Sequence, residues 1–486
     1  MRRWATLLAV LAAGCTTMEP KLGAVDPAVP ASWPSGSAEL SQAEAALPAL
    51  TYKQVFTDVR LQTLIAQALV NNRDLMIAAA NIAAAREQYR IQRANQLPQV
   101  NANGGVTLNG DDDNGVKVGG DLGLQVPSFE LDFFGRLRSL TKVQLERYLA
   151  TEAGARSTRL ALVSDIASAW LDYAADRSLL LVSQQTATAA EKSVRLTRLR
   201  LEGGIAPRTD LSQAQEILSQ AQANLAVQRT NLAQGVNALQ LLVGAPVDPS
   251  LLPATIDEAG PTIVPVPAGL GSAVLLRRPD VVQAEYELRA ANANIGAARA
   301  ALFPKISLTG LLGFASSALT SLFSGGAFAW SVGADASYTV FQAGAGHANV
   351  RLSEDQRNAA LATYQKAIQT AFREVADALA RRATMDEQLA ATQRQNAAAA
   401  DVATLVEARY HNGIDSYLSL LDAQRSYYQV QQVLVQTKLT AAQNRVALYQ
   451  AIGGDALLQN APLCEVRYVT TPAGATLANQ CPPLQS

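Results

Sequence analysis

The stretch YHNGIDSYLSLLDAQR, Tyr410–Arg425, predicts a helix end, a tight turn and the start of a second helix. Gly413 suits the turn because glycine adopts positive φ without steric cost. Ser416 can cap the following helix with its hydroxyl. Asp422 then lies one turn beyond Leu418 on the same helix face. A lone carboxylate on a helix surface is usually only solvated, so its meaning depends on the rest of the chain.

A second copy of this pattern occurs earlier, as EGGIAPRTDLSQAQ from 202 to 215. Gly204 matches Gly413, at an interval of 413 − 204 = 209 residues. The helical segment before each pattern repeats as well, since residues 71–98 resemble residues 277–304, and the prolines that end them are 304 − 98 = 206 apart. The chain is therefore a tandem duplication and not a short-period solenoid.

The composition excludes several classes of function. The 486 residues carry 40 Lys and Arg against 41 Asp and Glu, so there is no basic field for nucleic acid. His347 and His411, the two histidines, stand far apart without metal-ligand spacing. Phosphate-binding glycine loops, GxSxG and HExxH are absent, and no nucleophile and base are paired. We expect no metal, no cofactor and no enzymatic activity.

The N-terminus reads as an export signal. Arg2 and Arg3 precede the apolar run 4–13, which is too short to span a bilayer. LAAGC at 11–15 resembles a bacterial lipobox, although Ala12 stands where a leucine is usual. We expect a signal peptide over 1–14, a lipid on Cys15 and an extended leader over 15–57. The alternative is an ordinary cleaved signal that happens to contain a cysteine.

The other two cysteines, Cys464 and Cys481, lie in the C-terminal tail 455–486. Export places them in an oxidising compartment, where they are candidates for a disulfide. The sequence leaves the geometry of that pair open.

Each half of the duplication predicts the same order of elements: helix, strand pair, very long helix, shorter helix. The long helices fall in proline-free runs, and the strands show alternation around polar or Gly-rich turns. We expect a first repeat over 58–244, with strands in 100–126 and helices over 139–200 and 209–242. A linker over 245–270 leads to a second repeat over 271–454, with strands in 305–340 and helices over 347–409 and 416–452.

The four strands require several copies of the chain. The helices alone, rich in Ala, Gln, Ser and Thr, fit a hollow cylinder or a solid coiled-coil rod equally well. Each strand is about ten residues long, which is the length that crosses a bilayer when tilted. Four strands cannot close, and an open edge cannot face lipid. Two copies would supply eight strands and three would supply twelve, so the residues predict an oligomer without choosing its number.

Four motifs resemble the outer membrane factor family, the TolC-like exit ducts, in its lipoprotein branch. They are FELDFFGRLR at 129–138, GIAPRTDLSQAQ at 204–215, RRPDV at 277–281 and GIDSYLSLLDAQRS at 413–426. The resemblance implies a mostly α fold with a transmembrane β-barrel. It implies a homotrimer in which a 12-strand barrel in the outer membrane stands on a 12-helix barrel of about 100 Å in the periplasm.

The resemblance also implies roles for the turn residues. Asp422 would form an acidic ring at the periplasmic aperture, with Leu418 as an apolar constriction nearer the tip. Tyr410 and Arg425 match positions whose bonds hold the closed state, and Ser419 replaces the second acid of some relatives. An adaptor protein would dock at both helix-turn tips, which contain Gly204, Thr209, Asp210, Gly413 and Ser416.

The resemblance finally implies a passive duct anchored in outer membrane lipid. Its partners would be a periplasmic membrane-fusion adaptor and an inner-membrane transporter of the resistance-nodulation-division type. A type I protein secretion duct has the same fold with another inner-membrane partner. A periplasmic coiled-coil scaffold is the alternative from a different class, and the bilayer-length strands argue against it.

Overall fold

The computed structural model describes residues 17–23, 25, 51–111, 115–266, 272–323, 325–453, 455, 465–471 and 474–480. The predicted signal peptide and the predictions for Cys15, Cys464 and Cys481 lie outside these residues. The chain divides into two compact units. Unit 1 comprises Met1–Pro27, Asn81–Ala153 and Val282–Ala367, and unit 2 comprises Ala28–Ala80, Gly154–Val281 and Ile368–Ser486. Each unit therefore takes segments from both sequence repeats.

Helices make up most of the described chain. The α-helices are α2 (Tyr52–Val55), α3 (Val59–Asn71), α4 (Arg73–Ala94), α5 (Arg136–Glu202), α6 (Arg208–Val243), α7 (Ile256–Ala259), α8 (Pro279–Ala300), α9 (Ala345–His411) and α10 (Tyr417–Ala451). Short 3-10 helices are η2 (Pro249–Leu251), η3 (Gly260–Thr262), η4 (Ser272–Arg277) and η5 (Leu319–Ser321). None of the described helices has the length and apolar character to cross a membrane.

The duplication is visible in the helix lengths. Helices α5 and α9 each contain 67 residues, and neither contains a proline that would interrupt it. Helices α4 and α8 each contain 22 residues. The last helix of the first repeat, α6, ends at Gly244, which adopts the left-handed conformation at φ 73°.

The helical segment that begins the first repeat is broken into two helices, α3 and α4. The break is at Asn72, which is extended and separates α3 from α4. Its buried side chain accepts from the backbone N–H of Leu75 (3.1 Å) and donates to the carbonyl of Leu242 (2.8 Å). A Cβ on Gly244 would lie 2.4 Å from the carbonyl oxygen of Asn71. The break therefore follows from tight contact with the end of α6.

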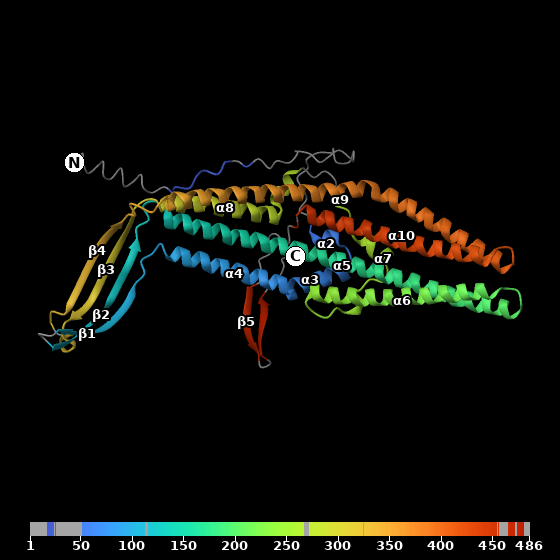
Figure 1. Cartoon of the computed structure of the whole chain (residues 1–486), viewed down its shortest axis with the longest axis horizontal. Coiled ribbons are helices and arrows are strands. Elements are labelled where there is room, and N and C mark those ends of the chain that lie inside the picture. The colour runs from blue at the N-terminus through green and yellow to red at the C-terminus, as the bar shows by residue number, and fades with distance from the viewer. Residues whose placement is uncertain are drawn as a thin grey trace. The chain divides into compact units, whose positions relative to one another are not determined.

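Four antiparallel strands form one sheet in the order β1-β2-β3-β4. They are β1 (Asn101–Asp111), β2 (Gly115–Glu130), β3 (Lys305–Ser316) and β4 (Phe328–Ser337). The central pairing of β2 with β3 joins the strand pair of one repeat to that of the other (Figure 1). Within the described chain, β1 and β4 are the two edges of this sheet.

Strand β2 is longer than predicted. The sequence predicted strands in 100–126, before Pro127, but β2 continues to Glu130. The pairing with β3 shifts between Val126, opposite Gly310, and Phe129, opposite Leu308. Proline lacks the N–H that a ladder requires, and it is tolerated here because it falls in this irregularity between paired residues.

The register sorts the side chains of the sheet onto two different faces. One face carries a continuous apolar set that includes Leu122 opposite Phe314, Leu124 opposite Leu312, and Leu312 opposite Trp330. The other face carries small and polar residues, such as Gly123 opposite Gly313 and Thr309 opposite Gly333. The apolar side chains are exposed in the single chain, with Trp330 at 70% and Val332 at 74%.

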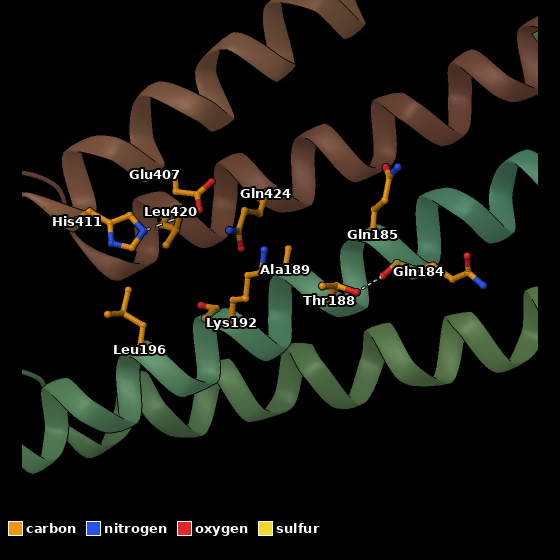
Figure 2. A pocket seen from close by; sticks show the side chains of 11 residues that line it. Gln184, Gln185, Thr188, Ala189, Lys192, Leu196, Glu407, His411, Leu420 and Gln424 are labelled. Carbon is orange, nitrogen blue, oxygen red and sulfur yellow. Dashed lines mark hydrogen bonds and ion pairs between the residues drawn. The ribbon is translucent and has the colours of Figure 1, made fainter.

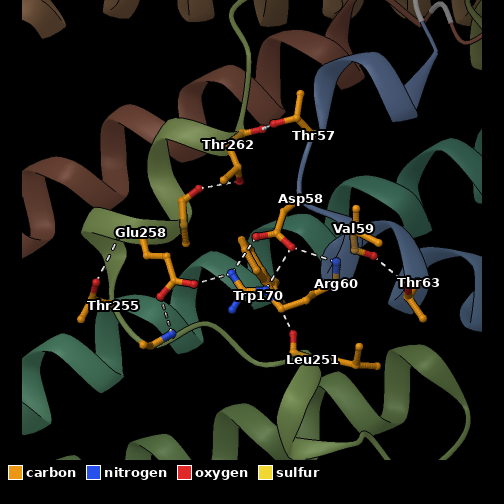
Figure 3. A network of polar contacts seen from close by, with 12 residues as sticks. Thr57, Asp58, Val59, Arg60, Thr63, Trp170, Leu251, Thr255, Glu258 and Thr262 are labelled. Atoms are coloured by element: carbon orange, nitrogen blue, oxygen red, sulfur yellow. Dashed lines mark hydrogen bonds and ion pairs between the residues drawn. The ribbon is translucent and has the colours of Figure 1, made fainter.

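A polar network in unit 2 holds the predicted linker against α3 and α5 (Figure 3). Arg60 donates to Asp58 (2.7 Å) and to Glu258, and its guanidinium lies 5.7 Å from the ring centroid of Trp170. The indole N–H of Trp170 donates to the carbonyl of Leu251 (3.0 Å). The hydrogen bonds from Arg60 lower the pKa of Asp58. The linker therefore packs as part of unit 2, with Ile256 fully buried.

Buried Arg278, in the RRPDV motif, connects three elements of unit 2. It donates to Asp280 (2.8 Å) at the start of α8, to Glu374 (2.8 Å) on α9 and to the carbonyl of Ala451 (2.8 Å) at the end of α10. A Cβ on Gly453 would lie 2.3 Å from the Arg278 side chain. The motif thus has a structural role here. Beyond it, β5 (Glu465–Thr471) and β6 (Gly474–Gln480) form an antiparallel hairpin that the sequence did not predict.

Candidate functional site

The two helix-turn tips have the same backbone structure. In tip 1, between α5 and α6, Gly203, Gly204 and Ile205 donate to the carbonyls of Leu199, Leu201 and Arg200. In tip 2, between α9 and α10, Asn412, Gly413 and Ile414 donate to the carbonyls of Ala408, Tyr410 and Arg409. Each of these residues lies 209 positions after its counterpart in tip 1. Gly204 and Gly413 adopt φ values of 71° and 73°. The turn predicted from Gly413 and its copy at Gly204 is therefore confirmed.

The helices after the two turns begin differently. Ser416 is the N-cap of α10, and its hydroxyl accepts from the N–H of Ser419 (3.2 Å), as the sequence predicted. The matching position in tip 1 is Pro207, whose backbone has nearly the same angles but whose side chain makes no cap.

The two tips pack against each other through an apolar cluster within unit 2. Its buried members come from α5 (Val194), α6 (Ala214), α9 (Tyr410) and α10 (Tyr417, Leu420, Leu421). Figure 1 shows both turns at the same end of these four helices. The Tyr417 hydroxyl lies 3.2 Å from that of Ser193 on α5, and burial raises the pKa of Tyr417. The cluster holds the second hairpin against the first.

Two equivalent arginines, Arg200 and Arg409, have different partners. Arg409 donates to both carboxylate oxygens of Asp415 (2.8 and 3.0 Å), within its own turn, which lowers the pKa of Asp415. Tip 1 has Ala206 at the position of Asp415. Arg200 instead crosses to tip 2, where its guanidinium lies 4.7 Å from the ring centroid of Tyr410 and donates to the Tyr410 carbonyl (3.2 Å).

Three of the four predicted gate residues lie on one face of α10. Leu418, Asp422 and Arg425 follow the i, i+4, i+7 spacing of a single helix face, and all three are exposed in the chain. Leu418 is 66% exposed, whereas its neighbours Tyr417 and Leu420 are buried. An apolar and an acidic side chain are thus presented side by side, away from the core of the hairpin pair.

The fourth predicted gate residue, Tyr410, lies in the apolar cluster and not on that face. Its ring contacts Arg200 and Tyr417, with 5.6 Å between the Tyr410 and Tyr417 centroids. Its hydroxyl oxygen is buried and has no hydrogen-bond partner among the described residues. Tyr410 therefore connects the second hairpin to Arg200 of the first hairpin.

The remaining predicted tip residues belong to tip 1. Thr209 is exposed and Asp210 is half-buried, at the start of α6. The 209-residue interval aligns Thr209 with Leu418, Asp210 with Ser419, and Gln213 with Asp422. Tip 1 therefore has no counterpart of the Leu418 and Asp422 pair.

A groove of about 590 Å³ lies between α5 and the second hairpin (Figure 2). Its lining is rich in amide and hydroxyl groups and includes Lys192, Glu407 and His411. His411 Nε2 lies 3.9 Å from Glu407 Oε1 on the preceding turn. Within the described residues, no three His, Cys, Asp or Glu side chains are grouped in a way that could hold a metal ion. The groove offers polar contacts and a mixed charge.

Sequence reasoning missed Arg200 and the Arg409–Asp415 pair. The signal was available, because aligning the repeats at 209 residues places Arg200 on Arg409 and Ala206 on Asp415. That substitution removes the local partner of one arginine, which then contacts the neighbouring hairpin.

The sequence profile of the family described as outer membrane efflux protein matches residues 64–245 and 270–454, which together exceed half of the chain. The chain belongs to the outer membrane efflux protein family. It is an outer membrane protein that acts in efflux, and the two matched ranges coincide closely with the two sequence repeats.

Individual relatives agree with this assignment. The antibiotic efflux pump outer membrane protein ArpC of Pseudomonas putida is 40% identical over 475 residues, covering 96% of this chain and 98% of ArpC. Outer membrane protein OprJ of Pseudomonas aeruginosa is 37% identical over 455 residues, covering 92% of this chain and 95% of OprJ.

A solved structure extends the agreement to the fold. The open state of the MtrE outer membrane channel of Neisseria gonorrhoeae superposes with a TM-score of 0.81 at 32% identity, covering 90% of this chain and 98% of MtrE. The fold of this efflux protein is therefore that of a TolC-like outer membrane channel, and its relatives are channels rather than enzymes.

Proposed function

We propose that three copies of this efflux protein form one passive duct across the outer membrane and the periplasm. Each copy contributes four strands to a 12-strand barrel and its long helices to a 12-helix barrel. An adaptor docks at the tips, and an inner-membrane transporter supplies the energy. The proposed lipid on Cys15 anchors the trimer, and the duct uses no cofactor.

The two-faced sheet with open edges is the observation that carries the proposal. Its apolar face, which includes Leu124, Leu312 and Trp330, suits contact with lipid, whereas its small and polar face suits a water-filled lumen. The edges β1 and β4 have no partner strand within the described sheet. An unpaired strand edge is unstable in hydrocarbon, so other copies must cover both edges.

The cargo we propose is a small organic molecule of the antibiotic class. The support is ArpC, which is described as part of an antibiotic efflux pump and is 40% identical over nearly the whole chain.

The gate we propose is the exposed face of α10. Around a three-fold axis, Leu418 would supply a ring of three apolar side chains and Asp422 a ring of three carboxylates. Three carboxylates favour cations and repel one another, so separation of the helices relieves their repulsion. Contact between Arg200 and Tyr410 opposes that separation, because it ties the second hairpin to the first.

Two adjacent residues of β4 test the barrel assignment. Val332 lies on the apolar face and Ser331 on the opposite face. A cationic side chain on the lipid face of a barrel is destabilising by about 2–4 kcal/mol near the bilayer centre, and it is tolerated in the lumen. We expect Val332→Arg to abolish the trimer in detergent extracts of outer membranes, and Ser331→Arg to leave its amount unchanged.

The readout is native mass spectrometry of the extracted protein. A stable, membrane-inserted monomer in the wild type contradicts the proposal. Equal loss of trimer in both variants contradicts the assignment of the two faces.

A further inference from the structure

Residues 17–23 lie along unit 1 and contact a helix of each repeat. The Glu19 carboxylate accepts from Lys142 Nζ on α5 (2.8 and 2.9 Å) and from Asn292 Nδ2 on α8 (3.0 Å). Asn292 also donates to the carbonyl of Pro20 (2.9 Å). Asn292 is buried where the segment crosses α8. One short segment thus bridges α5 and α8.

Two glycines make room for the backbone of this segment. A Cβ on Gly296, within α8, would lie 2.9 Å from the backbone nitrogen of Glu19. A Cβ on Gly135, just before α5, would lie 3.0 Å from the Cα of Thr17. Glycine inside a helix is less stable than alanine by about 1 kcal/mol. The Ser139 hydroxyl of α5 would also lie 2.9 Å from a Cβ on Gly296, so the close approach of Glu19 and of α5 together gives a physical reason for this glycine in the middle of α8.

We call the site on α8 that receives residues 17–23, formed by Asn292 and Gly296, the seat. Helix α4 of the first repeat has no such site. The 206-residue interval aligns Gly296 with Arg90 and Asn292 with Arg86 on α4. Arg90 is exposed and pairs with Glu87 on its own helix (2.7 Å). A long cationic side chain replaces the glycine there, so α4 does not offer the same seat.

The seat is not filled by the segment. An open groove of about 790 Å³ lies beside it, lined among others by Glu146, Glu285, Arg289 and Tyr364. Burial raises the pKa of Glu146 in this groove. The segment is therefore held at a few polar points and by two close backbone contacts, and not by extensive apolar burial.

We propose that residues 17–23 act as an intramolecular clamp that fastens α5 of the first repeat to α8 of the second. The clamp depends on the hydrogen bonds of Glu19 and on the space that Gly296 leaves for its backbone. The occupant of the seat is the chain's own N-terminal segment. Because Thr17 contacts Gly135 at the start of α5, the clamp also determines where the N-terminal end leaves the protein.

Tryptic cleavage after Lys21, in the purified trimer, measures release of the clamp. Lys21 is exposed within the clamp, and cleavage requires its backbone to leave the seat. We expect Gly296→Ala and Glu19→Ala each to accelerate this cleavage about tenfold. Gly296→Ala places a methyl group against the Glu19 backbone, and Glu19→Ala removes charged hydrogen bonds. Gly235→Ala is the matched control: Gly235 is also within a helix, but its Cβ would meet no atom closer than 3.8 Å.

Two outcomes overturn the clamp. One is an unchanged cleavage rate at Lys21 in Glu19→Ala, which leaves the helix surfaces intact. The other is acceleration in Gly235→Ala equal to that in Gly296→Ala, which would indicate a general effect of the substitution. Mass spectrometry of the released N-terminal peptide reports the lipid separately. A released peptide without lipid, together with slower cleavage at Lys21 in the wild type than in Glu19→Ala, would refute the lipidation while supporting the clamp.

Discussion

Tip 1, between α5 and α6, and tip 2, between α9 and α10, share a backbone and differ in chemistry. Three turn hydrogen bonds match position by position at an interval of 209 residues, and the two glycines differ by 2° in φ. Tip 2 closes on itself through Arg409 and Asp415 and carries Leu418 and Asp422 on its outer face. Tip 1 has lost the acid, and its arginine reaches across to Tyr410.

This difference assigns separate tasks to the two copies of one structural unit. Both tips keep a glycine in the left-handed conformation after the long helix, because a helical hairpin of this shape requires positive φ at that position. The side chains are free to diverge. Tip 1 becomes the support that holds the other hairpin, and tip 2 becomes the part that is held and that carries the candidate gate.

Of the substitutions proposed here, Arg200→Ala should change the stability of tip 2 relative to tip 1 the most. It removes a cation–π contact and a charged hydrogen bond, together about 2 kcal/mol, from the link between the tips. We expect the amides of 410–419 to exchange hydrogen about 30-fold faster, while those of 199–207 change little. Arg200→Lys should fall between, because lysine keeps the charge and loses the planar stacking.

Hydrogen exchange with mass spectrometry on the trimer provides this measurement, with Arg409→Ala as the matched control. That variant breaks only the pair inside tip 2. Equal protection of 410–419 in Arg200→Ala and the wild type would show that tip 1 does not hold tip 2.

Alanine at each turn glycine should have a smaller and equal effect. Gly204 and Gly413 both have positive φ, and a Cβ at either would meet no atom within 4 Å. The penalty is then backbone strain alone, about 1 kcal/mol in each case. We expect about fivefold faster local exchange at the substituted tip in Gly204→Ala and in Gly413→Ala. Markedly different increases in exchange in the two variants would mean that the two turns are not structurally equivalent.

The smallest effect is expected from giving tip 1 the acid of tip 2. Ala206→Asp offers Arg200 a local partner of the kind that Arg409 has in Asp415. An exposed ion pair is worth up to about 1 kcal/mol, so it competes only partly with the Tyr410 contact. We expect a modest rise in exchange over 410–419, below that of Arg200→Ala and reduced by added salt. Slower exchange there would contradict the competition.

The secondary structure of each repeat could be predicted from the sequence more easily than the contacts between the two repeats. Gly413, Ser416 and the long proline-free helices follow from local rules, and the structure has them where those rules place them. The helix break at Asn72 and the extension of β2 through Pro127 depend on distant partners, the end of α6 and the shifted pairing with β3. Local periodicity contains no information on either.

The candidate site shows the same limit. Leu418 and Asp422 share a helix face because of their spacing, which can be read from the sequence. Tyr410 was expected among the bonds of the closed state, and its partner Arg200 lies 210 residues away in the chain. Only the packing of the two hairpins brings that pair together.

Single-channel conductance in planar bilayers tests the central claim, that the outer face of tip 2 is the gate. The variant is Leu418→Ala with Asp422→Ala, and the control is Thr209→Ala with Gln213→Ala at the matching positions of tip 1. We predict a small, cation-selective conductance in the wild type and in the control. In the tip 2 variant, we predict a much larger conductance with weaker selectivity. An unchanged conductance in the tip 2 variant, or an equal rise in the control, would contradict the account.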